Sequence, residues 1–265
     1  MKRIKIGLAL GGGAARGLAY IGVLQSLERS GIPIDLVAGC SMGSIIGALY
    51  AKGIRPDEMA RIAGEIGSKG PGLFLSPTIP KSGLIGTTQI ENALTPFIGD
   101  TRFEDLRIPF ACVATDLHTG AEVIIRNGPL WEGIKASASI PVLFPVMELR
   151  GRHLTDGWLV NPVPVNVVRE MGADLVIGVV VTQEPVPQKE PDQTLFGVIM
   201  NTIYIVNQQL VKFSLKGADV IVQPSVAHIG FFDFDHALEC ILEGMSAGER
   251  AIPEIKKRYQ TLIKG

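Results

Sequence analysis

Hydrophobic residues in the first part of the chain form short continuous runs and helix-like stripes, and glycines separate the two. Residues 4–10 are an apolar run that three glycines end, and residues 14–30 carry apolar side chains at helical spacing. A second apolar run at 34–40 and a second helical segment at 42–52 repeat this order. Two consecutive strand–turn–helix units predict a parallel sheet with helices packed against it.

The rest of the chain continues the alternation. We expect helices at 56–67, 87–98, 130–138, 165–171 and 195–215, and strands at 110–115, 121–126, 174–182 and 220–223. A last helix at 235–262 should be interrupted at Pro253, because proline has no N–H to donate. Residues 68–86 and 183–193 are rich in glycine, proline or polar groups and are predicted to be loops.

These elements predict the fold class α/β, as a three-layer α/β/α arrangement with a mostly parallel central sheet. We expect a single domain over residues 1–265. Its motif-bearing region runs from about 5 to about 182, and its C-terminal helical part runs from about 193 to 265.

Composition and charge narrow the class of protein. The chain is 46% hydrophobic and 19% charged, which is typical of a globular protein. Its 25 basic and 26 acidic residues give a net charge of -1, whereas nucleic-acid-binding proteins normally carry a basic excess. Three cysteines without CxxC spacing argue against a disulfide framework and a zinc site. We expect no nucleic-acid partner, no metal and no cofactor.

The start of the chain resembles a signal peptide only superficially. Basic residues precede an apolar run, but the run is short and ends in Gly-Gly-Gly. No stretch of about 18 apolar residues predicts a transmembrane helix. We therefore expect a cytoplasmic location, with peripheral contact to a membrane left open.

One pentapeptide fits the pattern of a serine nucleophile. Gly39-Cys40-Ser41-Met42-Gly43 matches G-x-S-x-G, follows a predicted strand and opens a predicted helix. Such a sharp turn needs small residues around the serine, and the helix N-terminus favours a developing negative charge. The alternative is a tight turn whose serine only caps the helix. The Cys40 thiol is a weaker candidate, because the turn pattern selects the next residue.

The glycine-rich segment after the first strand reads Gly11-Gly-Gly-Ala-Ala-Arg16-Gly17. A P-loop would need a lysine after Gly17, and a dinucleotide fingerprint would need glycine where Arg16 stands. Asp35 lies near the distance of a ribose-binding acid, so nucleotide binding stays an alternative. The third interpretation is an oxyanion loop, in which backbone N–H groups of Gly11, Gly12 and Gly13 approach a substrate oxygen.

A serine hydroxyl needs a base, and the histidines fit the role poorly. His228 and His236 come late enough for a Ser-Asp-His order, but that arrangement places several strands before its nucleophile turn. His118 is expected in an exposed turn, and His153 could support a neighbouring base. Asp156 follows strand-like residues and precedes Gly157, so it is the remaining candidate. An Asp-Gly turn without chemistry is the alternative.

Taken together, four segments resemble the patatin-like phospholipase family, in particular its small bacterial members. They are 11–17, 39–43, 136–141 and Asp156-Gly157, in that order. The resemblance implies a Ser–Asp dyad without histidine, with Ser41 as nucleophile and Asp156 as base. It also implies an oxyanion loop at Gly11 to Gly13, steadied by Arg16, with Met42 beside the substrate. Ser137 and Ser139 are expected to have a structural role at a helix end.

The resemblance also implies lipid acyl hydrolysis, so the expected function is a serine phospholipase or esterase. A transacylase or thioesterase on the same dyad, or a non-catalytic acyl- or lipid-binding regulatory protein, are the alternatives. Trp158 departs from the family, which usually has glycine or alanine there, so its ring is expected to narrow or cover the site. Residues 73–75 and the helix at 195–215 are candidates for membrane contact, with ordinary core packing as the alternative.

Overall fold

The computed structural model describes residues 3–68, 88–181 and 194–264. Eight strands form one sheet: β1 (Ile6–Leu10), β2 (Leu36–Cys40), β3 (Phe110–Asp116), β4 (Glu122–Ile125), β5 (Met147–Leu149), β6 (Arg152–Asp156), β7 (Leu175–Val179) and β8 (Val220–Val222). The order is β5-β6-β3-β2-β1-β7-β8, with β4 paired to β3. Strands β3, β2, β1, β7 and β8 run parallel, and β4, β5 and β6 pair antiparallel. The predicted mostly parallel sheet is confirmed.

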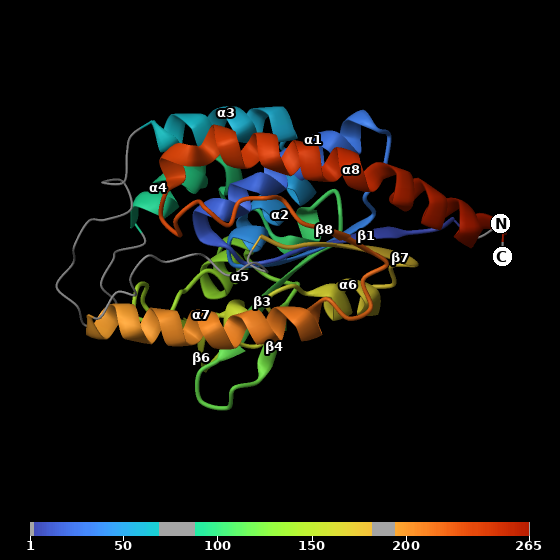
Figure 1. Ribbon diagram of the computed structural model, residues 1–265. Coiled ribbons are helices and arrows are strands. Elements are labelled where there is room, and N and C mark those ends of the chain that lie inside the picture. Colours follow the sequence, from blue (N-terminus) through green and yellow to red (C-terminus); the bar gives the residue numbers. More distant parts are fainter. Residues whose placement is uncertain (1–2, 69–87, 182–193, 265) are drawn as a thin grey trace.

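Helices lie on both faces of this sheet, as the sequence predicts. Figure 1 shows α1, α3 and α8 above the sheet and α6 and α7 below it. The helices are α1 (Ala19–Arg29), α2 (Met42–Lys52), α3 (Pro56–Gly67), α4 (Thr88–Ile98), α5 (Leu130–Ser137), α6 (Val165–Glu170), α7 (Leu195–Ser214) and α8 (Ala237–Lys264). Short 3-10 turns η1 (Ala14–Leu18), η3 (Phe103–Asp105), η4 (Gly157–Leu159) and η5 (Phe234–His236) connect them.

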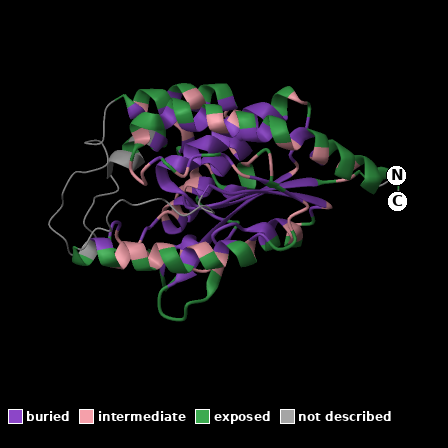
Figure 2. Ribbon diagram, in the orientation of Figure 1, coloured by how far each residue is buried: buried purple, intermediate pink, exposed green. Residues whose placement is uncertain are grey.

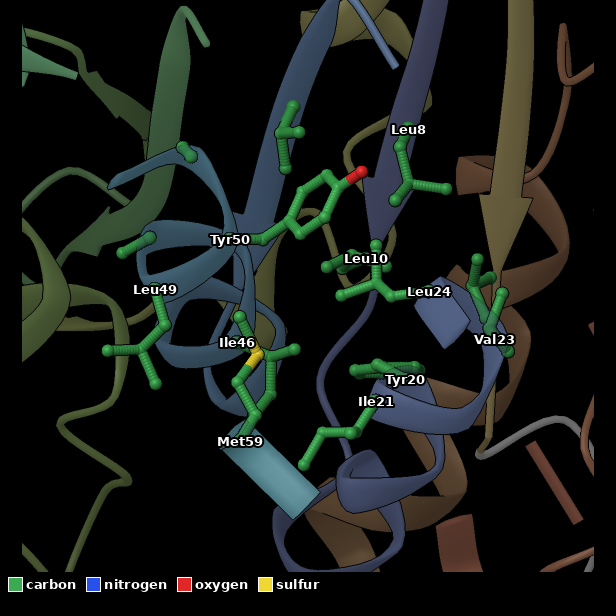
Figure 3. Close-up of a cluster of buried hydrophobic side chains, with 14 of the residues drawn as sticks. Leu8, Leu10, Tyr20, Ile21, Val23, Leu24, Ile46, Leu49, Tyr50 and Met59 are labelled. Atoms are coloured by element: carbon green, nitrogen blue, oxygen red, sulfur yellow. The ribbon is translucent and has the colours of Figure 1, made fainter. Parts of the chain in front are cut away.

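Alternation along β1 explains why the sheet is covered on both faces. Ile6, Leu8 and Leu10 join the larger core with residues of α1, α2 and α8. Figure 3 shows Leu8 and Leu10 among side chains of α1 and α2. Gly7 and Ala9 face the other layer, and a Cβ on Gly7 would lie 2.0 Å from a methyl group of Val168 in α6. The small residues on that side let α6 approach the strand closely.

Two features differ from the sequence-based expectations. The predicted interruption at Pro253 is wrong, because α8 continues through it. The proline lies on the exposed side of the helix, where water can satisfy the carbonyl group that loses its N–H partner. The sequence pattern also predicts only strand-like residues before Asp156, whereas the structure has an antiparallel hairpin of β5 and β6 there. The predicted loops, including Leu73 to Leu75, fall mainly outside the described residues. No helix among the described residues is long and apolar enough to span a bilayer.

Candidate active site

Ser41 occupies the sharp turn between β2 and α2. Its backbone has φ 53° and ψ -122°, a conformation that residues other than glycine rarely adopt. Helix α2 begins at the next residue, and the Ser41 carbonyl oxygen accepts the Ser44 N–H at 2.8 Å. The candidate nucleophile therefore lies on a strained turn at the positive end of a helix dipole.

The two glycines of the pentapeptide are required because backbones approach closely there. A Cβ on Gly39 would lie 2.3 Å from the carbonyl oxygen of Gly43. A Cβ on Gly43 would lie 2.2 Å from the carbonyl oxygen of Leu10. Any side chain at either position would push β1, β2 and α2 apart, which is the physical reason for the G-x-S-x-G spacing.

The end of α5 holds the backbone of Ser41 in place. The fully buried Ser137 hydroxyl accepts the Ser41 N–H at 3.1 Å and donates to the Val113 carbonyl oxygen at 2.6 Å. Ser137 therefore fixes the strained turn to β3. The sequence predicts only a helix-end role for this serine, because its partners lie 96 and 24 residues away along the chain.

Asp156 is brought beside Ser41 by β6, which returns along the C-terminal end of β3. Its backbone N–H donates to the Ser139 carbonyl oxygen at 2.9 Å, and its carbonyl oxygen accepts the Thr115 hydroxyl at 2.7 Å. A Cβ on Gly157 would lie 2.2 Å from the Val113 carbonyl oxygen. The glycine after the aspartate is thus required by close packing against β3.

The carboxyl group of Asp156 is almost completely buried, at 1% exposure. Burial raises its pKa to about 7, while the Ser41 side chain, the Trp158 N–H and the Cys40 thiol lower it. Oδ1 accepts the Trp158 N–H at 2.8 Å. No group within the described residues donates a hydrogen bond of ordinary geometry to Oδ2. The Ser41 side chain is nevertheless close enough to the carboxyl group to lower its pKa.

Cys40 does not compete with Ser41 as a nucleophile. Its thiol is fully buried and lies 3.7 Å from Asp156 Oδ1. Burial and the neighbouring carboxyl raise the pKa of this thiol well above its usual value. A protonated, buried thiol is a poor nucleophile. Cys112 and Cys240 are also buried and free.

The glycine loop passes next to Ser41, but two of its N–H groups already have acceptors. Gly11 donates to the Val179 carbonyl oxygen at 3.1 Å, and Gly12 donates to that of Pro162 at 3.0 Å. The N–H groups of Gly13 and Ala14 have no acceptor within the described residues, nor does that of Met42 at the start of α2. Ala14 itself has φ 45°. Of the three predicted donors, Gly13 is therefore open to a ligand, whereas the N–H groups of Gly11 and Gly12 are already used within the fold.

Arg16 links this loop to the C-terminal part of the chain. Its guanidinium is 3% exposed and donates to the Ile229 carbonyl oxygen at 2.6 Å and to the Tyr204 hydroxyl at 3.5 Å. The Ala15 N–H donates to the Phe231 carbonyl oxygen at 3.1 Å. The contacts with Ile229 and Phe231 tie the loop to the segment before η5, and the contact with Tyr204 ties it to α7; a steadying role of Arg16 in catalysis stays a prediction.

A pocket with an internal volume of about 70 Å³, partly open to solvent, lies above Ser41. Its wall is mainly aliphatic and aromatic, with Lys135 as the charged residue in its lining. The lining consists of Ala14, Ser41, Met42, Ile45, Trp131, Ile134, Lys135, Ala138, Ser139, Ile140, Phe144, Phe232 and Phe234. An apolar pocket beside a serine is suited to an acyl chain.

Trp158 does not cover this pocket. Its ring is 4% exposed and lies against the glycine loop, where a Cβ on Gly12 would be 2.8 Å from Trp158 Cδ1. It packs between Tyr204 of α7 and Phe231, with ring centroids 6.1 Å apart in each pair. The ring therefore bounds the site on the side of α7.

The remaining candidates lie away from Ser41. His118 and His153 pair with each other at 3.1 Å, and His228 and His236 both contact Glu239; none of the four lines the pocket. Within the described residues, no group of three or more histidine, cysteine, aspartate or glutamate side chains is placed to hold a metal ion.

The nucleotide-binding alternative is also unsupported by the position of Asp35. Its side chain accepts the Ile6 N–H at 2.9 Å, at the N-terminal end of β1. The glycine loop leaves the opposite end of that strand, so Asp35 cannot hold the ribose of a nucleotide on the loop.

The fold and the site together define an α/β protein with a serine at a strand-to-helix turn beside a buried carboxyl. Residues 8–169 match the family model of patatin-like phospholipase. The chain therefore belongs to the patatin-like phospholipase family.

Individual relatives agree with this assignment. An uncharacterized NTE family protein of Mycobacterium bovis is 39% identical over 175 residues, covering 66% of this chain and 48% of the relative. Patatin-like phospholipase domain-containing protein 6 of Homo sapiens is 33% identical over 230 residues, which cover 84% of this chain and 16% of the relative. Lysophospholipase NTE1 of Saccharomyces cerevisiae is 36% identical over 178 residues, covering 66% and 10%. The chain thus spans about half or less of these relatives.

A solved structure supports the fold alone. VipD from Legionella pneumophila matches with a TM-score of 0.57 and 12% identity, covering 97% of this chain and 67% of that chain.

Proposed function

We propose that the protein is a serine acyl hydrolase that cleaves lipid esters, with Ser41 as nucleophile and Asp156 as general base. The observation that carries the proposal is a strained serine at a helix N-terminus, next to a buried carboxyl and below an apolar pocket. Family membership and a relative named lysophospholipase support the same reaction class.

The reaction proceeds in two steps through an acyl-enzyme. Asp156 accepts the proton of the Ser41 hydroxyl while Oγ attacks the ester carbonyl carbon. The resulting oxyanion is stabilised by the N–H groups of Gly13, Ala14 and Met42 and by the dipole of α2. The carbon–oxygen bond then breaks, and the alcohol leaves with the proton from Asp156. A water molecule then attacks the carbonyl carbon of the acyl group and gives a proton to Asp156. The bond between this carbon and Ser41 Oγ breaks, the fatty acid leaves, and Asp156 returns the proton to Oγ.

Burial is what makes a carboxylate useful as a base here. An ordinary carboxylate is too weakly basic to take a hydroxyl proton efficiently near pH 7. The pKa of Asp156 is raised to about 7, so the group binds a proton more strongly and is still partly ionised at neutral pH. The buried position supplies the base strength that a histidine supplies in other serine hydrolases.

Hydrolysis assays with matched variants test the proposal. Wild type should release fatty acid from lysophosphatidylcholine or from nitrophenyl acyl esters, and Ser41→Ala and Asp156→Asn should each lose at least about 10³-fold in kcat/KM. Ser26→Ala, at a buried serine of α1, and Asp116→Asn, at a carboxyl of β3, are the controls and should keep activity. Full activity in either site variant would contradict the dyad.

We also propose that α7 brings the site to a lipid surface. Its outer face exposes large apolar side chains and, as Figure 2 shows, the helix lies on the outside of the molecule: Leu195, Val198, Ile205, Val206 and Phe213 are 51–80% exposed. The helix contains no acidic residue and one lysine, Lys212. Met200 of the same helix packs against the cluster of Ile140, Leu143 and Phe144, two of which (Ile140 and Phe144) line the pocket above Ser41. An exposed, uncharged helix face beside an acyl pocket fits an interfacial role.

Liposome sedimentation tests this contact. Val198→Glu with Ile205→Glu should reduce binding to phosphatidylcholine–phosphatidylglycerol vesicles. The control is Leu238→Glu with Leu242→Glu, a similarly exposed pair on α8, which lies on the other side of the sheet (Figure 1). Equal loss of binding in both double variants, or no binding by wild type, would contradict the role of α7.

A further inference from the structure

A second cavity lies beneath α7, and Trp158 forms part of its wall. The cavity has an internal volume of about 160 Å³ and is partly open to solvent. Besides Trp158 and Leu159, its lining comes from one face of α7: Thr202, Ile203, Val206, Asn207 and Leu210. It is mainly apolar, so it offers an environment similar to that of the pocket above Ser41.

The indole of Trp158 separates this cavity from the nucleophile. A Cβ placed on Gly12 would lie 2.8 Å from Trp158 Cδ1 and 3.4 Å from Ser41 Cβ. The pyrrole edge of the ring thus reaches the glycine loop directly beside Ser41, while the same side chain lines the cavity beneath α7. Trp158 therefore lies between the part of the glycine loop beside Ser41 and the cavity beneath α7.

The surroundings hold the ring in this position. It packs between Tyr204 of α7 and Phe231, and Phe232 next to the latter lines the pocket above Ser41. The side-chain amide of Asn207 donates to the Trp158 carbonyl oxygen, which fixes the backbone at that residue. The indole therefore cannot swing away without disturbing both aromatic neighbours.

Hydrogen bonding does not explain a tryptophan at this position. Its Nε1–H is buried and has no acceptor within the described residues. A phenylalanine would fill most of the same space without leaving a buried donor unpaired. What tryptophan adds is the width of its ring across the gap between Gly12 and α7.

We propose that Trp158 makes the site selective for esters that carry a single acyl chain. The inference rests on the proposed function and adds a determinant of its substrate class. A single chain fits the one apolar pocket above Ser41, whereas an ester with two acyl chains needs a second apolar compartment near the nucleophile. The cavity beneath α7 is such a compartment, and the indole closes the passage to it.

The test compares Trp158→Ala with wild type on a pair of substrates. Lysophosphatidylcholine and phosphatidylcholine with the same acyl chain are presented in the same mixed micelles, and the ratio of their kcat/KM values is measured. Wild type should favour the single-chain ester. Trp158→Ala should shift the ratio toward the two-chain ester by about tenfold or more, the size of effect typical of a changed apolar pocket. An unchanged ratio overturns the proposal.

Two further variants keep the result interpretable. Trp158→Phe retains most of the ring, so its ratio should stay nearer to that of wild type; if Trp158→Ala does not fold, Trp158→Leu takes its place. Trp131→Ala enlarges the pocket above Ser41 from the side of α5 without removing the ring beside Gly12. The same shift in Trp131→Ala would assign the effect to loosened packing and would overturn the proposal.

Failure of this inference is distinguishable from failure of the proposed function. A wild type that hydrolyses both esters equally well overturns the role of Trp158 and leaves the serine hydrolase intact. A wild type that hydrolyses neither ester, and whose Ser41 does not react with a fluorophosphonate, contradicts the proposed function itself.

Discussion

Replacing Asp156 by asparagine should make the protein more stable while removing its activity. Burial raises the pKa of this carboxyl from 3.8 to about 7, so the folded protein holds the proton more tightly than the unfolded chain does. The neutral carboxyl therefore contributes stability that is fully present below about pH 4 and is lost as the pH rises through about 7. From the two pKa values, this aspartate lowers the free energy of unfolding by about 4 kcal/mol at pH 8 and by about 1.5 kcal/mol at pH 5, relative to a side chain that is always neutral.

Asparagine avoids this cost because it is neutral at both pH values. It keeps the shape of the aspartate and can still accept the Trp158 N–H through Oδ1. Chemical unfolding monitored by circular dichroism should show that the free energy of unfolding rises by about 4 kcal/mol at pH 8 and by only about 1.5 kcal/mol at pH 5. The corresponding rise in Tm at pH 8 is about 10 °C.

Asp116→Asn is the matched control for this experiment. Partial burial raises the pKa of Asp116, but the backbone N–H groups of Thr119 and His118 outweigh burial and lower it. Its asparagine variant should therefore show no gain at pH 8. If Asp156→Asn is no more stable than wild type at pH 8, or gains equally at both pH values, the reasoning from burial is refuted.

The remaining predictions concern the rate profile and the turn around Ser41. Because the base must be ionised and its pKa is raised to about 7, kcat/KM should fall about a hundredfold from pH 8 to pH 5; a flat profile would speak against this base. Ser137→Ala removes the acceptor of the Ser41 N–H, so ester hydrolysis assays should show about a tenfold lower kcat. The free energy of unfolding should fall by about 1–2 kcal/mol. An unchanged kcat would contradict a role of Ser137 in positioning the nucleophile. Gly43→Ala should fail to give a cooperatively folded protein, because its Cβ would lie 2.2 Å from a carbonyl oxygen, whereas Gly64→Ala, with no atom within 4 Å, should fold; a well-folded Gly43→Ala would contradict the close packing at the turn.

The parts of the fold that the sequence predicts are those determined by local patterns. Apolar runs define β1, which glycines follow, and β2, which the Ser41 turn follows; the parallel order follows because each strand is succeeded by a helix. The G-x-S-x-G turn is likewise local, since its glycines and its serine lie within five residues. The patatin-like fold is confirmed by the family match and by the sheet. That residues 1–265 form a single domain stays a prediction.

What the sequence does not predict depends on contacts between distant segments. The β5–β6 hairpin is short and partly exposed, so it lacks a clear apolar alternation. The contacts of Ser137 with Ser41, and of Thr115 with the Asp156 backbone, appear only once the sheet is assembled. The N–H groups of Gly11 and Gly12 are unavailable to a substrate because both already donate to carbonyl oxygens of the fold. Those oxygens belong to residues more than 140 positions away in the sequence.

The central claim is that Ser41 is an activated nucleophile and that Asp156 activates it. The most direct measurement is labelling with a fluorophosphonate, followed by mass-spectrometric location of the adduct in wild type, Ser41→Ala and Asp156→Asn. The account predicts an adduct on Ser41 in wild type, none in Ser41→Ala, and much slower labelling in Asp156→Asn although that variant is folded. An adduct on another residue, or labelling of Ser41 at the same rate in Asp156→Asn, would contradict it.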